Sequence, residues 1–564
     1  MKLEIQIGIL RTVWHELGGS LQVHQNRVLQ VLQLRLQEAT VLIDGAIGKP
    51  ENQISIDSVI RKKGRLHRGT FALSLKECLE KTIKDLERWH DMFDPSWFLI
   101  TRISSRNIDQ QLTDERASKS DLVSTMRSLR VELWTESQSV GNKSSIFIST
   151  AHFLAERSPI PFSPSQFSQE RENGRDVIVD TIFCNPMAQI ATTTKDIRDL
   201  AKVLSKTDPL TFGLLACRGV IKVADSTKKV TKFELIFTIP EGLKTPRSLR
   251  SLLLVGDHLY PLNKRIDLAK QLAKSVMFVH TSQFVHKNIR PETIVVFKNE
   301  VSKLGTPFLV GFENVRTADG VTYYLGDSEW EKNLYRHPKR QGSVPEEDYK
   351  MQHDIYSLGV CLLELGLWSS FVHYNKEADH PTTGPALDIA EQLSMKDQRK
   401  KAFEIKGILV DMAKDRLPSR IGKKYTEIVV SCLTCLDKED NGFGDESDFV
   451  DEDGISVGVR YIEKVGVLIP HLNYADRLRF CCKLRRYQFG QRKSHDLQSQ
   501  CCISRYCTVS LHWKSPKSGP VGAEFSYFLP SALAVCIVLV CQGSLKAFPS
   551  QNVCRPLFPP SASG

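Results

Sequence analysis

The chain has 564 residues, of which 41% are hydrophobic and 25% are charged, and its formal net charge is +11. These fractions are ordinary for globular proteins, and the length predicts about two to four domains. Most of the positive charge falls in residues 466–564, so the rest of the chain is nearly neutral and the charge gives no support to nucleic-acid binding.

Cysteine is distributed as unevenly as charge. It is sparse and unpatterned before residue 466, whereas more than half of the 14 cysteines follow that point. Sparse cysteine fits a reducing compartment. The first residues, Met1-Lys2-Leu3-Glu4-Ile5, begin no sustained apolar run and no small-residue cleavage site, so no signal peptide is indicated. We therefore expect a cytoplasmic protein.

Residues 1–136 are predicted to form an N-terminal all-α helical bundle. Apolar side chains recur at helical spacing over residues 22–46, about 70–93 and about 119–136. Each segment has one apolar stripe and one charged face, so each needs partners to bury the stripe. A bundle that only mediates contacts with other proteins is the alternative to one with an activity of its own.

Residues 137–175 are rich in Ser, Pro, Asn and Gln, and this composition predicts a linker. Beyond them, strands and helices alternate. A short strand is expected at 177–179, a helix at 195–204, β-rich segments at 212–220 and 232–239, and a helix at 265–280. The breaker Pro240-Glu241-Gly242 separates a strand-rich part from a helical part, which predicts an α+β domain with two lobes.

The segment from Phe284 to Phe297 resembles the catalytic loop of protein kinases, H-R-D-L-K-P-E-N followed by an apolar strand. His286, the basic Arg290, Pro291 and Glu292 remain, and they mainly shape the loop, whereas Lys287 belongs to its degenerate part. Asn288 stands where a kinase has the Asp that accepts the substrate proton, and Thr293 stands where it has an Asn that binds metal.

Further kinase landmarks follow in order. Gly311-Phe312-Glu313 takes the place of D-F-G, Tyr335 and Pro338 lie in the A-P-E segment, and Asp354 and Gly359 fit a D-x-W-S-x-G helix. Residues 176–465 thus resemble a protein-kinase domain, and the resemblance implies a bilobal kinase-like fold closed by a helix near residue 465.

The groups that a kinase uses in catalysis are missing from these positions. Gly311 has no carboxylate to hold Mg²⁺, and the amide of Asn288 is not a base. No Lys occurs in residues 176–194, where the third strand should supply one, and no G-x-G-x-x-G precedes the first strand. Phosphoryl transfer depends on the positioning and charge of these groups.

We therefore expect a pseudokinase with no functional catalytic residue, no metal and no required cofactor, and leave residual ATP binding open. Two alternatives stay open. The first is an atypical active Ser/Thr kinase that binds ATP and recruits metal through Glu313 or Glu292. The second is a non-enzymatic scaffold that binds proteins.

Other patterns receive ordinary explanations. Cys432 and Cys435 form a lone C-x-x-C in an apolar helical run and are expected in the core. Residues 437–448 only superficially match a calcium-binding loop. The basic cluster Arg336, His337, Lys339 and Arg340 is expected to be a solvated loop face. The apolar run 525–541 is shorter than the roughly 20 residues that span a bilayer.

Residues 466–564 are expected to be an irregular, non-native tail. After a tidy helical pattern that ends at Val465, the chain shows doubled cysteines, few acids and no periodicity. Translation through an unspliced intron or a shifted frame would give such a segment.

Residues 86–100 resemble a narrower family, filamentous-fungal proteins with a HeLo-like prion-inhibition-and-propagation domain. Segments 284–291, 334–342 and 353–368 are similar to the degenerate kinase domain of the same family. The resemblance implies a bundle that acts at membranes in heterokaryon incompatibility or cell death, with unidentified protein partners and a peripheral membrane location. The chain departs from this family at its start, where only residues 5–10 are apolar.

Overall fold

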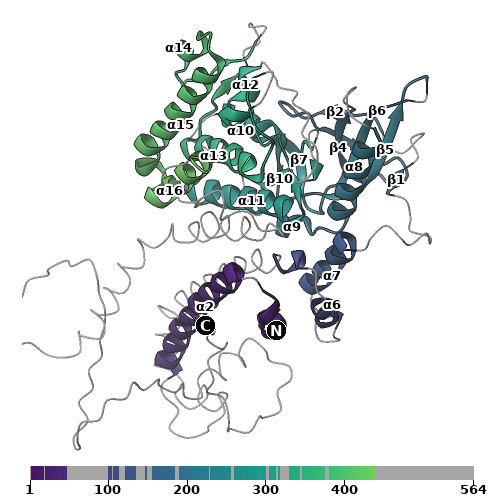
Figure 1. Cartoon of the computed structure of the whole chain (residues 1–564), viewed down its shortest axis with the longest axis vertical. Coiled ribbons are helices and arrows are strands. Elements are labelled where there is room, and N and C mark those ends of the chain that lie inside the picture. The colour runs from purple at the N-terminus through teal and green to yellow at the C-terminus, as the bar shows by residue number, and fades with distance from the viewer. Residues whose placement is uncertain are drawn as a thin grey trace, which may run out of the picture. The chain divides into compact units, whose positions relative to one another are not determined.

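The computed structural model describes residues 2–17, 19–47, 99–103, 106–113, 121–134, 146–148, 155–184, 190–227, 229–255, 260–299, 304–312, 316–317, 329–342, 346–374 and 380–437 (Figure 1). The chain divides into two compact units, residues 1–39 with 55–472 and residues 40–54 with 473–564. The helix predicted at 70–93, the acidic segment 438–450 and the tail 466–564 lie outside the described residues.

The N-terminal part is helical where it is described. Its elements are α1 (Lys2–Val13), η1 (Trp14–Glu16), α2 (Gly19–Ile47), η3 (Leu99–Arg102), α6 (Arg106–Thr113) and α7 (Asp121–Trp134). Helices α2 and α7 confirm two predictions, and Met126 and Leu129 are buried as the spacing requires. The buried Arg130 of α7 donates to the carboxylate of Asp109 at 2.6 Å and to the carbonyl of Ile100 at 3.1 Å, which ties α7 to α6 and η3.

A six-stranded sheet follows, in the order β1-β5-β6-β4-β3-β2. Its strands are β1 (Phe147–Ile148), β2 (Ser158–Pro159), β3 (Gln166–Gln169), β4 (Asp176–Phe183), β5 (Ala216–Ala224) and β6 (Val230–Thr238). All neighbours are antiparallel except β1, which runs parallel to β5. Helix α8 (Ile190–Ser205) lies beside the sheet and buries Ile197, Leu200 and Leu204 (Figure 1).

Strands β1, β2 and β3 lie within residues 137–175, so the prediction of a linker there is wrong for these strands. The composition concealed them because β2 and β3 are short and built largely of Ser, Pro and Gln. A strand predicted from Phe212 begins later, at Ala216. Asp208 caps a short helix, α9 (Pro209–Phe212), whose first residue is a proline, and both features favour a helix start.

The C-terminal part of the described chain is mainly helical. Its helices are α10 (Leu249–Leu254), α11 (Leu262–Thr281), η6 (Pro291–Thr293), α12 (Trp330–Asn333), η7 (Pro338–Arg340), α13 (Met351–Leu367), α14 (Ala390–Leu393), α15 (Gln398–Arg420) and α16 (Lys423–Leu433). Its strands form small sheets of β7 (Lys244–Ser248) with β9 (Ile294–Lys298) and β10 (Thr306–Leu309), β8 (Phe284–Val285) with β11 (Arg316–Thr317), and β12 (Val372–His373) with β13 (Thr382–Thr383).

Helix α13 is the centre of this part, since every one of its residues is buried among α11, α15 and α16 (Figure 1). Gly359 allows the close approach of α16, because a Cβ at this position would lie 2.8 Å from the Cβ of Cys432. Cys432 and Cys435 are both buried, which confirms the prediction that they are core residues.

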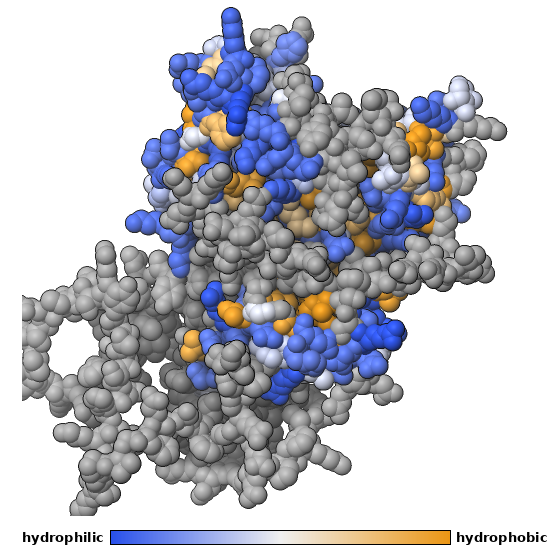
Figure 2. Space-filling view, viewed as in Figure 1, coloured by the Kyte–Doolittle hydropathy of each residue, from blue (hydrophilic) through white to orange (hydrophobic). Residues whose placement is uncertain are grey.

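On the face that Figure 2 shows, the described surface is mostly hydrophilic, with small hydrophobic patches between hydrophilic residues. Among the described helices, none combines the length and the hydropathy that crossing a bilayer requires.

Candidate functional site

The loop that follows β8 is held in shape by Asp354, at the start of α13. Its carboxylate accepts hydrogen bonds from the backbone N–H groups of His286 at 2.7 Å and Lys287 at 2.9 Å. The side chains of His280 and Tyr349 also bond to it, at 3.0 and 2.6 Å. Burial alone would raise the pKa of Asp354, but these partners, His280 first, hold it at about 2. The ionised carboxylate fixes the loop, including Lys287 at its positive φ of 66°.

His286 joins this loop to the segment after β10. Its Nδ1 accepts from the N–H of Asn288 at 3.3 Å, so Nε2 carries the proton and donates to the carbonyl of Val310 at 3.2 Å. The ring lies 4.7 Å from that of Phe312, centroid to centroid. Burial lowers the pKa of His286 to about 4, which keeps the ring neutral near pH 7.

Asn288 uses its side-chain amide for contacts within the protein. Its Nδ2 donates to the carbonyl of Gly311 at 3.2 Å, and its Oδ1 accepts from Nε of Arg290 at 2.9 Å. A carboxamide held at both ends positions neighbouring residues and does not take up a proton near pH 7.

Thr293 and Gly311 pack tightly against each other. Gly311 has φ of +81°, and a Cβ at this position would lie 2.5 Å from Cγ2 of Thr293. The Thr293 hydroxyl donates to the carbonyl of Asn288 at 2.7 Å and accepts from the N–H of Arg290 at 3.2 Å. The methyl group of Thr293 therefore fills the space beside Gly311 and leaves no room for a side chain at residue 311.

A buried carboxylate from the large sheet reaches the same place. Asp180 of β4 accepts a hydrogen bond from the N–H of Gly311 at 2.6 Å and another from the hydroxyl of Ser165. Sequence reasoning noted the missing lysine in this strand and overlooked the acid. The acid could have been noticed in the sequence, because an Asp within an otherwise apolar strand is expected to be buried and to need hydrogen-bond partners.

Residues 160–165, between β2 and β3, close over this region as a loop. The carbonyl of Pro161 accepts hydrogen bonds from the hydroxyls of Ser248 at 2.6 Å and Ser251 at 3.0 Å. The ring of Phe162 lies 5.1 Å from that of Tyr374. Together with the Ser165–Asp180 bond, these contacts fasten the loop to β4, α10 and the segment after β12.

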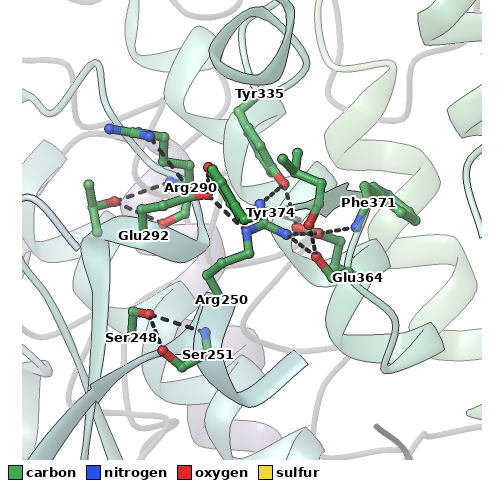
Figure 3. Close-up of polar contacts among 12 residues, drawn as sticks. Ser248, Arg250, Ser251, Arg290, Glu292, Tyr335, Glu364, Phe371 and Tyr374 are labelled. Atoms are coloured by element: carbon green, nitrogen blue, oxygen red, sulfur yellow. Dashed lines mark hydrogen bonds and ion pairs between the residues drawn. The ribbon is translucent and has the colours of Figure 1, made fainter. Parts of the chain in front are cut away.

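Arg250 of α10 is the hub of a buried polar network (Figure 3). It donates from Nε to Glu292 at 2.8 Å, and from Nη1 to Glu364 at 2.6 Å and to Ser370 at 2.7 Å. The hydroxyl of Tyr335 accepts from Nη2 and donates to Glu364 at 2.8 Å. The network joins α10, η6, α13 and the segment that follows α12 around one guanidinium.

The two acids of this network differ in their pKa. Burial would raise the pKa of Glu292, but Arg250 and then Arg290, whose Nη1 lies 3.8 Å away, lower it below the usual value. Burial raises the pKa of Glu364, because the charge of Arg250 offsets only part of the effect of desolvation on the carboxylate. The pKa of Arg250 is raised well above its usual value by the two carboxylates, which outweigh its burial.

The basic cluster predicted to be a solvated loop face is partly buried. His337 and Arg340 are buried, so the prediction is wrong for these two residues.

Three side chains that could bind a metal lie close together here. The ligand atoms of His337, Glu347 and His353 are within 4.8 Å of one another. Backbone N–H groups donate to Nδ1 of His337, at 3.4 Å, and to Nδ1 of His353, at 2.8 Å. Both Nε2 atoms then carry the protons, and His353 donates its own to Glu347 at 2.9 Å. Because a metal needs the lone pair of Nε2, this arrangement does not favour a metal site.

The remaining predicted residues have structural positions. Pro291 and Pro338 occupy the first positions of η6 and η7, and Tyr335 lies in the Arg250 network. Phe312 is buried, whereas Glu313 lies outside the described residues.

Comparison with known proteins gives weak and partial matches. No protein-family model matches the chain. The chain is 29% identical over 103 residues to a probable serine/threonine-protein kinase of Clostridium acetobutylicum, which covers 18% of this chain and 14% of that protein. It is 25% identical over 173 residues to serine/threonine-protein kinase TIO of Arabidopsis thaliana, covering 31% and 12%.

It is also 26% identical over 176 residues to U-box domain-containing protein 51 of Arabidopsis thaliana, covering 29% of this chain and 22% of that protein. The chain thus spans less than a quarter of the length of these relatives. Part of it is similar to serine/threonine protein kinases.

Proposed function

We propose that residues 155–437 form a protein-kinase-like domain that has lost phosphoryl transfer and serves as a non-catalytic signalling module. The partial similarity to serine/threonine kinases supports the kinase-like part. So does the order of elements, in which a sheet with one helix is followed by a helical part that carries the loop after β8. That loop keeps its anchor, Asp354.

The packing of Gly311 on Thr293 carries the proposal that catalysis is lost. Kinases take both metal ligands from the positions that these residues match. Neither residue offers a carboxylate or an amide, and the methyl group of Thr293 occupies the space that a side chain at residue 311 needs. A single substitution back to the kinase residue would therefore not rebuild the site.

The charge of the cleft supports the same proposal. Val177-Ile178-Val179-Asp180 matches the V-A-I-K pattern with an acid in place of the lysine that pairs with ATP phosphates. A buried carboxylate repels phosphates strongly, because screening by water is weak there. The loop at 160–165, where a kinase has its glycine-rich loop, contains Pro161 and Pro164 and no glycine.

Two measurements on the full chain test this proposal. Mg-ATP is expected to leave the melting temperature unchanged, and incorporation of labelled γ-phosphate is expected to equal that of heat-denatured protein. Asn288→Asp, which restores the base alone, should give the same result. Transfer that disappears in Asn288→Ala would contradict the proposal and favour an atypical active kinase.

We extend the proposal to the N-terminal helices, which would transmit the signal as a membrane-associated effector in fungal heterokaryon incompatibility or cell death. The support is the resemblance of residues 86–100 to the HeLo-like family, and most of that stretch lies outside the described residues. The protein would then be cytoplasmic or peripheral at a membrane, with protein partners.

Expression of the full chain in a filamentous fungus should impair growth, and deletion of residues 1–135 should abolish the effect. An equal effect of both forms would contradict the role of these helices. Normal growth with both forms, together with recovery of bound proteins, would favour a plain scaffold.

A further inference from the structure

The β5 edge of the six-stranded sheet is shaped to hold the short strand β1. We propose that Gly219, Val220, Ile221 and Lys222, which we call the β5 slot, form a peptide-docking site that residues 146–148 of the same chain occupy. The proposal concerns how the connection between α7 and β2 is held, and it does not depend on whether the domain is catalytic.

The slot has a notch at Gly219. A Cβ at this position would overlap the side chain of Ile148 and would lie 2.9 Å from the carbonyl oxygen of Ile146. Gly219 lies at a register shift between β5 and β6, where the edge departs from regular pairing. Any other residue here would displace the docked strand, because the oxygen belongs to the backbone and has little freedom to move.

Backbone bonding fixes the register of the docked strand. The N–H of Val220 donates to the carbonyl of Ile146 at 2.9 Å, and Ile148 is the Cα partner of Ile221. The strand thus satisfies polar groups of an edge that would otherwise be open to other chains. Lys222 lies over the ring of Phe147, with Nζ 3.9 Å from the centroid, a distance suited to a cation–π interaction.

An apolar cluster recognises the side chain of Ile148. Val177, Val179, Ile221 and Ile236 form a buried cluster separate from the larger core that includes α8, and Ile148 packs against it. A short parallel pair of two residues would bind weakly by backbone bonds alone. The notch and this cluster supply the shape and the apolar surface that make the contact specific.

Docking limits how far the sheet and the N-terminal helices can separate. Between Trp134 and Ile146 the chain can extend at most about 40 Å, whereas between Trp134 and Ala155 it can extend about 70 Å. Release of the strand would therefore lengthen the connection considerably. It would also expose an edge that can pair with another extended segment.

Hydrogen exchange in the full chain tests the docked state. Gly219→Val and Ile148→Asp disturb the contact from its two sides, and each should raise the exchange rate of the Val220 amide at least tenfold. Gly407→Ala is the matched control, because a Cβ there has no atom within 4 Å, and it should leave the rate unchanged. Unchanged exchange in both variants would overturn the proposal.

A labelled peptide of residues 144–150 tests the slot as a binding site. It should bind the Ile148→Asp protein, whose slot is vacated, and not the Ile148→Asp/Gly219→Val protein, whose notch is filled. Equal binding to both would overturn the site, as would binding to neither. Sedimentation in which wild-type protein is a dimer and Ile148→Asp is a monomer would overturn the assignment to the same chain, since a second copy would then fill the slot.

Discussion

Asp180 accepts a hydrogen bond from the backbone N–H of Gly311 at 2.6 Å, although 131 residues separate them in the sequence. The contact joins the six-stranded sheet to the segment after β10. The buried carboxylate also accepts a hydrogen bond from the hydroxyl of Ser165, so it couples the loop at 160–165 to the segment after β10.

Asp180→Ala should destabilise the fold by about 1–3 kcal/mol, because it removes the acceptor of the hydrogen bonds from the Gly311 N–H and the Ser165 hydroxyl. Chemical denaturation of the full chain measures this. Asp176→Ala is the control on the same strand. That partly exposed side chain accepts from Gln169, and its substitution should change stability by less than about 0.5 kcal/mol.

Gly311→Ala should cost about 1–3 kcal/mol, because φ is +81° and the new Cβ meets Thr293. Thr293→Ser removes the methyl group and keeps the hydroxyl that bonds to Asn288 and Arg290. The double variant Gly311→Ala/Thr293→Ser should be at least about 0.5 kcal/mol more stable than the sum of the two single-variant costs predicts. If the costs of the two single variants add up to that of the double variant, the new Cβ at residue 311 and the methyl group of Thr293 do not compete for the same space.

Arg250→Ala should cost about 3–5 kcal/mol, since it leaves Glu292 and Glu364 buried without their cation. Arg399→Ala is the matched control. The guanidinium of Arg399 lies 2.9 Å from the carboxylate of Glu346, but the Arg399 side chain is 71% exposed. This substitution should cost at most about 0.5 kcal/mol. Similar losses in the two variants would mean that the buried network has no special role.

Stability should fall as pH decreases from 7 to 5, in part because of His337. Burial, with the charge of Lys406 nearby, lowers its pKa to about 2, while the unfolded chain has a value near 6.5. Between these values the unfolded state binds the extra proton, so folding loses up to about 2 kcal/mol at pH 5.

His337→Phe should keep the aromatic contact with Tyr356 and remove this titration. Its melting temperature should therefore decline less over the same range, by a few degrees. His373→Gln, at an exposed position, should follow the wild-type curve. A His337→Phe curve parallel to that of the wild type would refute the linkage.

Local patterns in the sequence were sufficient for several elements. Apolar spacing predicted α2, α7 and α11, and the continuous apolar character around Cys432 predicted its burial. These predictions succeed because the periodicity of one segment shows which face it must bury. The same reasoning failed at 137–175, where strands are stabilised by pairing with β4 and β5 rather than by their own composition.

The sequence by itself determined what particular positions cannot supply, since the amide of Asn288 is not a base and Gly311 has no side-chain metal ligand, wherever these residues lie. Only the tertiary structure decided what replaces those groups. Thr293 fills the space beside Gly311, Asp180 bonds to its N–H, and Arg250 gathers partners up to 120 residues away. Such contacts are set by packing between distant segments, which no local pattern records.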